Sequence, residues 1–194
     1  MPLIASRAGG SASGFGGLRT FGAAAGAVDT GSMFPIGAVT VGNSNATTVT
    51  FSSIPATYTH LQIRCITANA TSGNASSGIY YSVNSDSTNG NYKSHALYAD
   101  ASTVTSNANN RLMGVIGNVN GYGSYVLDIL DYANTNKYTT FRSLGGFNQN
   151  GYGFVWYASG VWLNTSAVNS ISFACDGGDF LKFTQFALYG IKGA

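Results

Sequence analysis

The segment LQIRCI at residues 61–66 alternates between apolar and polar positions. Its apolar residues Leu61, Ile63 and Cys65 share one face of an extended chain, and its polar residues share the other. A period of two residues is typical of a strand with one face in a core and the other in solvent. The pattern therefore predicts a half-buried β-strand.

Short runs rich in Val, Ile, Thr, Tyr and Phe recur along the chain, separated by Gly, Asn and Ser. Such runs, bounded by turn-forming residues, are strand signals. We expect strands at residues 36–41, 47–51, 61–66, 79–83, 92–98, 111–119, 124–130, 138–142, 154–158, 161–163, 168–175 and 180–191. The chain shows no amphipathic helical pattern and no repeat of fixed period. The predicted fold class is all-β, an antiparallel β-sandwich or jelly roll.

Residues 1–35 break this pattern, because Gly and Ala dominate and no periodicity appears. So many glycines make a self-standing element costly in conformational entropy. Isolated apolar residues are still spaced along the segment, and the candidate anchors are Phe15, Leu18, Phe21 and Phe34. We predict an extended assembly arm at 1–35 that orders on a partner, followed by a β-sandwich body at 36–194. A disordered N-terminus is the alternative.

Charged residues make up only 8% of the 194 residues, against roughly 25% in an average soluble domain. The acidic residues are all Asp, and the net charge of +2 comes without a basic run. These features exclude the electrostatic footprint of a nucleic-acid-binding protein. A surface so short of charge suits contacts with other protein better than contact with water. We therefore expect a homo-oligomer, with a trimer favoured.

Residues suited to catalysis or metal binding are few and scattered. His60 and His95 come without the Gly-x-Ser-x-Gly elbow of a serine hydrolase. Asp128 and Asp131 are interpreted as strand-end and turn residues rather than as the carboxylate pair of a glycosidase. Segment 84–91 faintly resembles a calcium loop but lacks the closing Glu, so an ordinary turn is expected. We predict no catalytic residue, no metal site and no cofactor, and therefore no enzyme.

Cys65 and Cys175 each lie in a strand-like run. Two cysteines so far apart make no disulfide framework, and we expect both to be small buried hydrophobic residues, with a disulfide as the alternative. The N-terminus lacks the apolar core of a signal peptide, and the Gly/Ala-rich segment 22–28 is too short to span a bilayer. We expect synthesis in a cytoplasm and no membrane insertion.

Aromatic residues are the remaining candidates for ligand contact. Tyr in a setting of Ser, Gly and Asn is the composition of adaptable binding loops, and aromatic faces also stack on sugar rings. We select Tyr122, Tyr152 and Trp156 as candidates for surface or ligand contact, because they fall in or beside Gly/Asn/Ser-rich segments. The alternative for each ring is packing in the core or at a subunit interface.

Three segments resemble tail- and fibre-associated structural proteins of tailed bacteriophages, including marine and cyanobacterial phages. They are FSSIPATYTHLQIR at 51–64, LDILDYANTNKY at 127–138 and FALYGIKG at 186–193. Their order and spacing match that family over residues 47–193. The resemblance implies a virion structural protein made in the host cytoplasm. Its expected partners are other virion proteins, with a host-surface glycan as a candidate.

The resemblance leaves the position in the virion open. The leading hypothesis is a tail or fibre appendage subunit for assembly and host-surface contact. A capsid decoration (cement) protein, whose arm staples neighbouring capsomers, is the main alternative, and a baseplate part is a further one. A carbohydrate-active enzyme is the hypothesis from another class, and the absence of Glu disfavours it.

Overall fold

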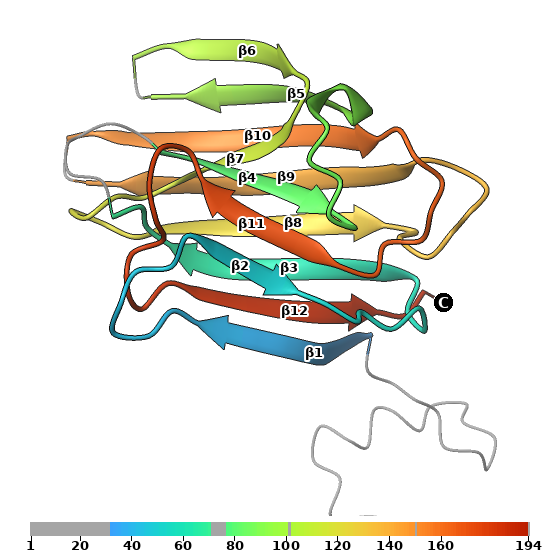
Figure 1. The fold of residues 1–194 in the computed structure, drawn as a ribbon. Helices are drawn as coiled ribbons and strands as arrows, with labels where there is room; N and C mark the ends of the chain where they lie inside the picture. Colours follow the sequence, from blue (N-terminus) through green and yellow to red (C-terminus); the bar gives the residue numbers. More distant parts are fainter. Residues whose placement is uncertain (1–31, 71–76, 101, 150, 194) are drawn as a thin grey trace, which may run out of the picture. The chain divides into compact units, whose positions relative to one another are not determined.

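The computed structural model describes residues 32–70, 77–100, 102–149 and 151–193 (Figure 1). These residues form twelve strands and one short 3-10 helix, η3 (Asn89–Asn91). The strands are β1 (Met33–Thr40), β2 (Thr48–Phe51), β3 (His60–Thr67), β4 (Ser77–Val83), β5 (Tyr92–Ala99), β6 (Val104–Asn109), β7 (Leu112–Ile116), β8 (Gly123–Leu130), β9 (Thr139–Asn148), β10 (Gly153–Trp162), β11 (Ile171–Cys175) and β12 (Gln185–Ile191). None of the described residues belongs to a helix long and apolar enough to cross a membrane.

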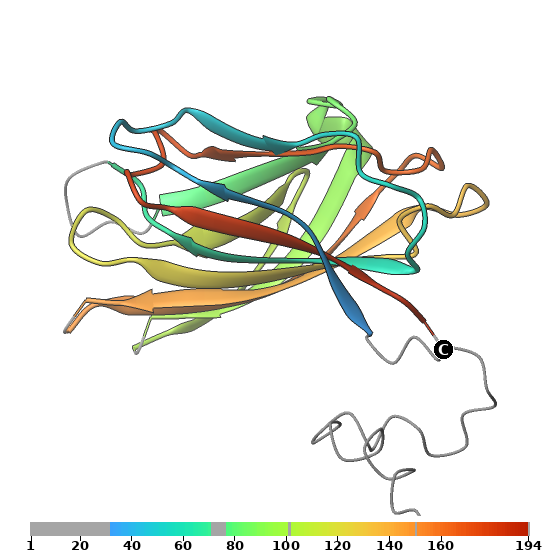
Figure 2. The ribbon, with the colours of Figure 1, turned by 90° about the horizontal axis from the view of Figure 1, so that it is seen from below.

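The strands form two sheets that face each other (Figure 2). The large sheet has eight strands in the order β1-β12-β3-β8-β9-β10-β5-β6, and the small sheet has four in the order β2-β11-β4-β7. Every pairing between these strands is antiparallel. The predicted antiparallel β-sandwich is therefore confirmed.

Two-thirds of the strands have the connectivity of a jelly roll, in which the chain crosses between the sheets at nearly every step. Strands β1, β3, β8 and β12 lie in the large sheet and β2, β4, β7 and β11 in the small sheet, and among these eight only β4 and β7 follow each other within one sheet. The remaining strands are two inserted antiparallel pairs, β5–β6 after β4 and β9–β10 after β8. These four strands, which we call the extension, widen the large sheet beyond β8.

The alternation in the sequence decides which side chains enter the core. In β8, Tyr125, Leu127 and Ile129 are buried, while the intervening residues are less covered. Their partners on β3 are Cys65, Ile63 and Leu61, which are buried as well. The face assignment that the sequence predicts for 61–66 is therefore confirmed, and both strands contribute one continuous apolar face.

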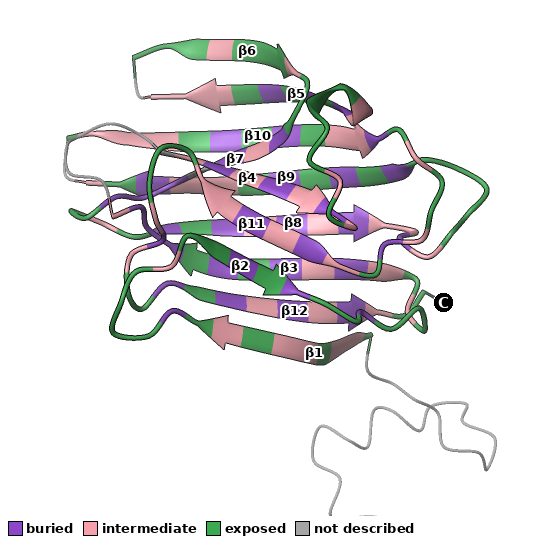
Figure 3. Cartoon of the chain, in the orientation of Figure 1, coloured by how far each residue is buried: buried purple, intermediate pink, exposed green. Residues whose placement is uncertain are grey.

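Aromatic rings join the two sheets through the core. Phe173 on β11 lies against Phe186 on β12, with ring centroids 5.0 Å apart. Tyr81 on β4 lies against Phe141 on β9 at 5.9 Å. Burying each such side chain contributes about 1.5–3 kcal/mol. Figure 3 shows the buried positions concentrated where the sheets overlap.

The sequence pattern missed β6 and divided β10. No residue of β6 is buried, because this strand lies at the edge of the large sheet and pairs with β5 alone. An edge strand with little covered surface needs no apolar alternation. Segments 154–158 and 161–163 form one strand, because Gly160 continues the ladder opposite Phe141 and Ser94.

The boundary between arm and body lies earlier than predicted. β1 begins at Met33, and Phe34 pairs with Gly190 of β12. The Phe34 ring stacks on Tyr58 with centroids 5.7 Å apart. Phe34 is therefore a residue of the body and not an arm anchor, because its backbone pairs within the large sheet and its half-buried ring packs on Tyr58. The other anchors, Phe15, Leu18 and Phe21, lie outside the described residues.

The cysteines do not form a disulfide; both are free thiols. Cys65 is buried, and Cys175 is partly buried. Burial raises the pKa of the Cys65 thiol, and burial together with the charge of Asp179 raises the pKa of Cys175 to about 12. Both side chains therefore behave mainly as small hydrophobic residues at neutral pH.

A truncation series will test the boundary. A chain that begins at Met33 should fold as the body, whereas a chain that begins at Ile36 should unfold with a free energy lower by about 1–3 kcal/mol. The second chain loses the Phe34–Tyr58 contact and the ladder from Met33 to Pro35. Urea unfolding followed by fluorescence measures the difference. Equal stability of the two chains would place these residues outside the body.

Thiol labelling will test the cysteines. Because the thiolate is the reacting species, Cys65 should resist iodoacetamide at pH 8 in the native protein and react fully in denaturant. Cys175 should react slowly in the native state, since it is only partly buried. Mass spectrometry of the native and denatured samples gives both rates. Rapid native labelling of Cys65 would contradict the packing of β3 against β8.

Candidate functional site

The structure corrects the prediction for Trp156, which was expected at the surface. Only 4% of Trp156 is exposed. It lies on the inward face of β10, opposite Gly145 of β9 and Tyr98 of β5. Its ring stacks on Tyr98 with centroids 5.4 Å apart. The sequence placed Trp156 in a Gly-rich neighbourhood, but strand pairing turns it into the core.

Tyr152 and Tyr122 have different environments. Tyr152 is half-buried and packs on Phe147 at 6.0 Å and on Phe154 at 5.6 Å. Tyr122 is 39% exposed, and its hydroxyl donates a hydrogen bond of 2.5 Å to the carbonyl of Lys182. Tyr152 therefore belongs to the same aromatic cluster as Trp156, while Tyr122 anchors one loop to another.

The carboxylates considered for catalysis have protein partners. Asp128 accepts hydrogen bonds from Gln62 Nε2 at 2.8 Å and from Arg142 Nη2 at 2.7 Å. Asp131 pairs with Lys137, and its backbone N–H donates to His60 Nδ1 at 2.9 Å. These contacts tie β3, β8 and β9 together at one end of the sheet. Asp131 lies in the turn after β8, as predicted, whereas Asp128 lies within β8, opposite Gln62 and Arg142.

Segment 84–91 is organised around Asp86. The Asp86 Oδ2 atom accepts hydrogen bonds from Trp162 Nε1 and from Asn91 Nδ2, each at 2.8 Å. Its Oδ1 atom accepts a bond of 3.0 Å from the Thr88 N–H. The bond from Trp162 lowers the pKa of Asp86 most, and those from Asn91 and Thr88 add to it, while burial opposes them. The carboxylate therefore fixes this loop against β10.

The outer face of the large sheet carries a set of exposed apolar side chains. Leu144, Tyr157 and Leu97 stand directly opposite one another on β9, β10 and β5. Val155 and Val104 lie in the next row of the same face, since both are in register with Ala99. These five side chains, which we call the apolar strip, are between 48% and 71% exposed.

The apolar strip lies entirely on the extension. A hollow of about 830 Å³ borders it, where Gly146 opposite Val155 and Gly153 opposite Asn148 leave the sheet without side chains. The sequence carried a signal for this surface, because β10 reads Phe154-Val-Trp-Tyr157 with apolar residues on both faces. A strand that is apolar on both faces normally has both of them covered.

The edge strand β6 adds a second neutral feature beside the apolar strip. Its sequence, Val-Thr-Ser-Asn-Ala-Asn, contains no charged residue and no proline. The opposite edge, β1, carries Pro35 and a register shift between Pro35 and Gly37. Charges, prolines and bulges are the usual protection of an edge against pairing with another chain. Of the two edges, only β1 has such protection.

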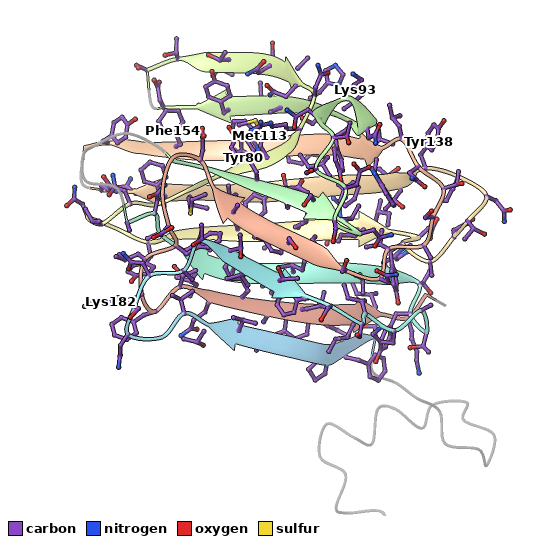
Figure 4. All side chains as sticks on the ribbon, in the orientation of Figure 1. Tyr80, Lys93, Met113, Tyr138, Phe154 and Lys182 are labelled. Carbon is purple, nitrogen blue, oxygen red and sulfur yellow. The ribbon has the colours of Figure 1, made fainter. Side chains whose placement is uncertain are left out.

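A smaller concave surface lies on the outer face of the small sheet. A cavity of about 280 Å³ is bounded by Tyr80 and Ser82 of β4, Ser172 and Ala174 of β11, and Arg111. Figure 4 labels Tyr80, which lies beside Met113 on the neighbouring β7. No pattern in the sequence predicts this surface, because Tyr80, Arg111 and Ser172 are far apart along the chain.

The loop around Asp86 should respond to substitution and to pH. Asp86→Ala leaves the buried Trp162 Nε1 without its acceptor, which should cost about 1–3 kcal/mol of unfolding free energy. Asp100→Ala is a control, since Asp100 accepts backbone bonds from Ser102 and Thr103 in an exposed turn. It should cost less. Because the pKa of Asp86 is lowered in the folded state, its contribution is present above the unfolded pKa and is lost as the pH falls below about 4.

Urea titrations at pH 7 and at pH 3 measure this dependence. The difference between the wild type and Asp86→Ala should shrink at the lower pH, where Asp86 becomes protonated. A difference that stays constant between the two pH values would contradict a role for the ionised carboxylate.

No family model, no curated protein and no solved structure matches this chain. The geometry of its surfaces is therefore the structural basis for a functional proposal.

Proposed function

We propose that the protein is a structural subunit of a tailed-bacteriophage virion that assembles with further copies of itself through the apolar strip. The tail or fibre appendage is the position we favour, with assembly and host-surface contact as its roles. The observation that carries the assembly role is the exposure of Leu97, Leu144 and Tyr157 in one continuous row.

The energetics favour covering this surface. Soluble monomers rarely expose large contiguous apolar patches, and each square ångström of apolar surface removed from water contributes roughly 25 cal/mol. No charged side chain interrupts the row from Leu144 to Leu97. The centre of a protein interface is depleted of charge in the same way. A second copy supplies a matching uncharged surface, because the whole chain has only 8% charged residues.

The position of the strip supports a dedicated role. The jelly-roll strands bury their core without the extension's outer face, so folding does not require Leu97, Leu144 or Val155 to be apolar there. Retaining apolar residues at exposed positions needs another reason. A homo-oligomer provides one, and a trimer is the state we favour.

The resemblance to tail and fibre proteins supports the virion location. Its three segments cover the loop from β2 into β3, β8 with the following loop, and β12. These belong to the jelly roll, whereas the apolar strip lies on the inserted strands. Scaffold and interface are thus carried by different parts of the chain. The capsid decoration protein remains the second candidate, since an arm that ends at Ser32 could also staple capsomers.

Charge substitutions will test assembly. Leu97→Lys combined with Leu144→Lys should weaken self-association at least about tenfold, because a charge would have to be buried at the contact. Both side chains are more than half exposed, so the fold should persist. Leu163→Lys, an exposed leucine outside the strip, is the control. Light scattering at micromolar concentration gives the mass. A wild type that is monomeric, or a double variant with unchanged mass, would overturn the proposal.

Localisation of the protein on virions tests its proposed position in the particle. A labelled antibody against the full chain should decorate the tail or its fibres on purified particles. Decoration of the capsid would select the cement protein instead, and absence from particles would overturn the virion role. Deleting residues 1–32, and so sparing β1, should abolish incorporation if the N-terminal segment is the attachment arm. Normal incorporation would contradict that role.

A further inference from the structure

The cavity on the small sheet has a floor of small side chains. Ser82 and Ser172 face each other across β4 and β11, and Ala174 is opposite Tyr80 in the next row. Thr50 on β2 extends the first row, and its hydroxyl lies 2.9 Å from that of Ser172. The floor of the depression is therefore made of small side chains, most of which carry a hydroxyl group.

Tyr80 and Arg111 form one wall of this depression. The Arg111 guanidinium lies over the Tyr80 ring, with Cζ 4.8 Å from the ring centroid. Its Nε–H donates a bond of 2.9 Å to Oδ1 of Asn89 in η3. Among the described residues, Arg111 forms no ion pair with a carboxylate. The remaining guanidinium N–H groups are held in a fixed orientation beside an aromatic ring.

The loop that carries Asn89 is itself fixed. Asp86 lines the cavity and is held by the buried Trp162 and by Asn91. Asn89 therefore reaches Arg111 from a loop anchored on β10, and hydrogen bonds within the chain hold this wall of the cavity in place. Such preorganisation lowers the entropic cost of binding.

The charges around the cavity decide the class of ligand. Tyr80 contacts Asp176, since burial and then a hydrogen bond to Asp176 raise the pKa of Tyr80. Glycine at position 78 leaves room for this contact, because a methyl group there would lie 3.3 Å from Asp176 Cβ. The cavity is lined by one guanidinium, that of Arg111, and by one carboxylate, that of Asp86, while Asp176 contacts Tyr80. The lining therefore offers an anion no net positive charge, whereas a neutral polyhydroxylated ligand finds both donors and acceptors.

We propose that this cavity binds one residue of a neutral saccharide. The Tyr80 ring provides an apolar wall for the sugar's C–H groups. Arg111 donates to sugar hydroxyls, while Ser82 and Ser172, which also line the cavity, accept from them. A cavity of about 280 Å³ is just below the range of roughly 300–1,000 Å³ found for small-molecule sites, which suits a single ring. The inference deepens the host-contact part of the proposed function and rests on it for the source of the sugar.

Saturation-transfer NMR on the full chain will test the site. The probes are glucose, galactose, mannose and N-acetylglucosamine at millimolar concentration, with sialic acid, glucuronate and inorganic phosphate beside them. At least one neutral sugar should bind, and the acidic probes should bind more weakly. Binding of none of the neutral sugars, or stronger binding of an acidic probe or phosphate, would overturn the proposal.

Matched variants locate the binding. Arg111→Ala removes the donor, and Ser82→Leu fills the floor; each should weaken binding at least about tenfold. The controls are Arg142→Ala and Ser124→Leu, which change exposed residues on the large sheet. Thermal unfolding checks that every variant folds. Equal weakening by the controls, or none by Arg111→Ala and Ser82→Leu, would overturn the assignment.

Amide chemical shifts of the wild type locate the bound sugar without any substitution. Sugar addition should shift the amides of residues 80–82, 111 and 172–174, and shifts confined to β9 and β10 would contradict the site. Light scattering on the same samples separates the two proposals. An oligomer that binds no sugar overturns only the saccharide site, and a monomer that binds one overturns only the assembly role.

Discussion

Phe173 and Phe186 meet across the two sheets with their ring centroids 5.0 Å apart, and Phe180 meets Phe186 at 5.3 Å. This contact holds a four-stranded sheet against the jelly-roll half of an eight-stranded one. The positions of the apolar strip and of the cavity on the small sheet follow from this contact. The inner faces are filled by the core, so the apolar strip and the cavity both lie on outer faces of the sheets. The two outer faces differ in chemistry because the two sheets differ in width.

The wide sheet gains its extra strands from two inserted pairs, and these pairs carry the apolar strip. On the inward side of the extension, Trp156, Tyr98 and Phe154 form an aromatic cluster that reaches beyond the small sheet's own core rings. The extension is thus apolar on both faces. One face is stabilised by packing within the chain, and the other is free for a partner, in keeping with assembly.

The narrow sheet has an outer face of a different kind. Its hydroxyl-lined floor depends on Ser82 and Ser172, and its wall depends on the stacking of Arg111 over Tyr80. The loop held by Asp86 keeps Asn89 beside Arg111. A hydrogen bond to a buried indole thus fixes an exposed polar surface. Assembly through the wide sheet would leave this surface open to solvent.

The sequence by itself determined most of the strands, though not β6, and the apolar side of strands such as β3, because a period of two needs only neighbouring residues. It therefore predicted the all-β fold and the buried face of β3. Only the tertiary structure decided which faces are covered. Trp156 entered the core, Phe34 joined β1, and Tyr157 remained exposed although it follows Trp156 directly. The contact between Tyr80 and Arg111 could likewise not be predicted from the sequence. Strand order and register bring these distant residues together, and neither leaves a local pattern in the chain.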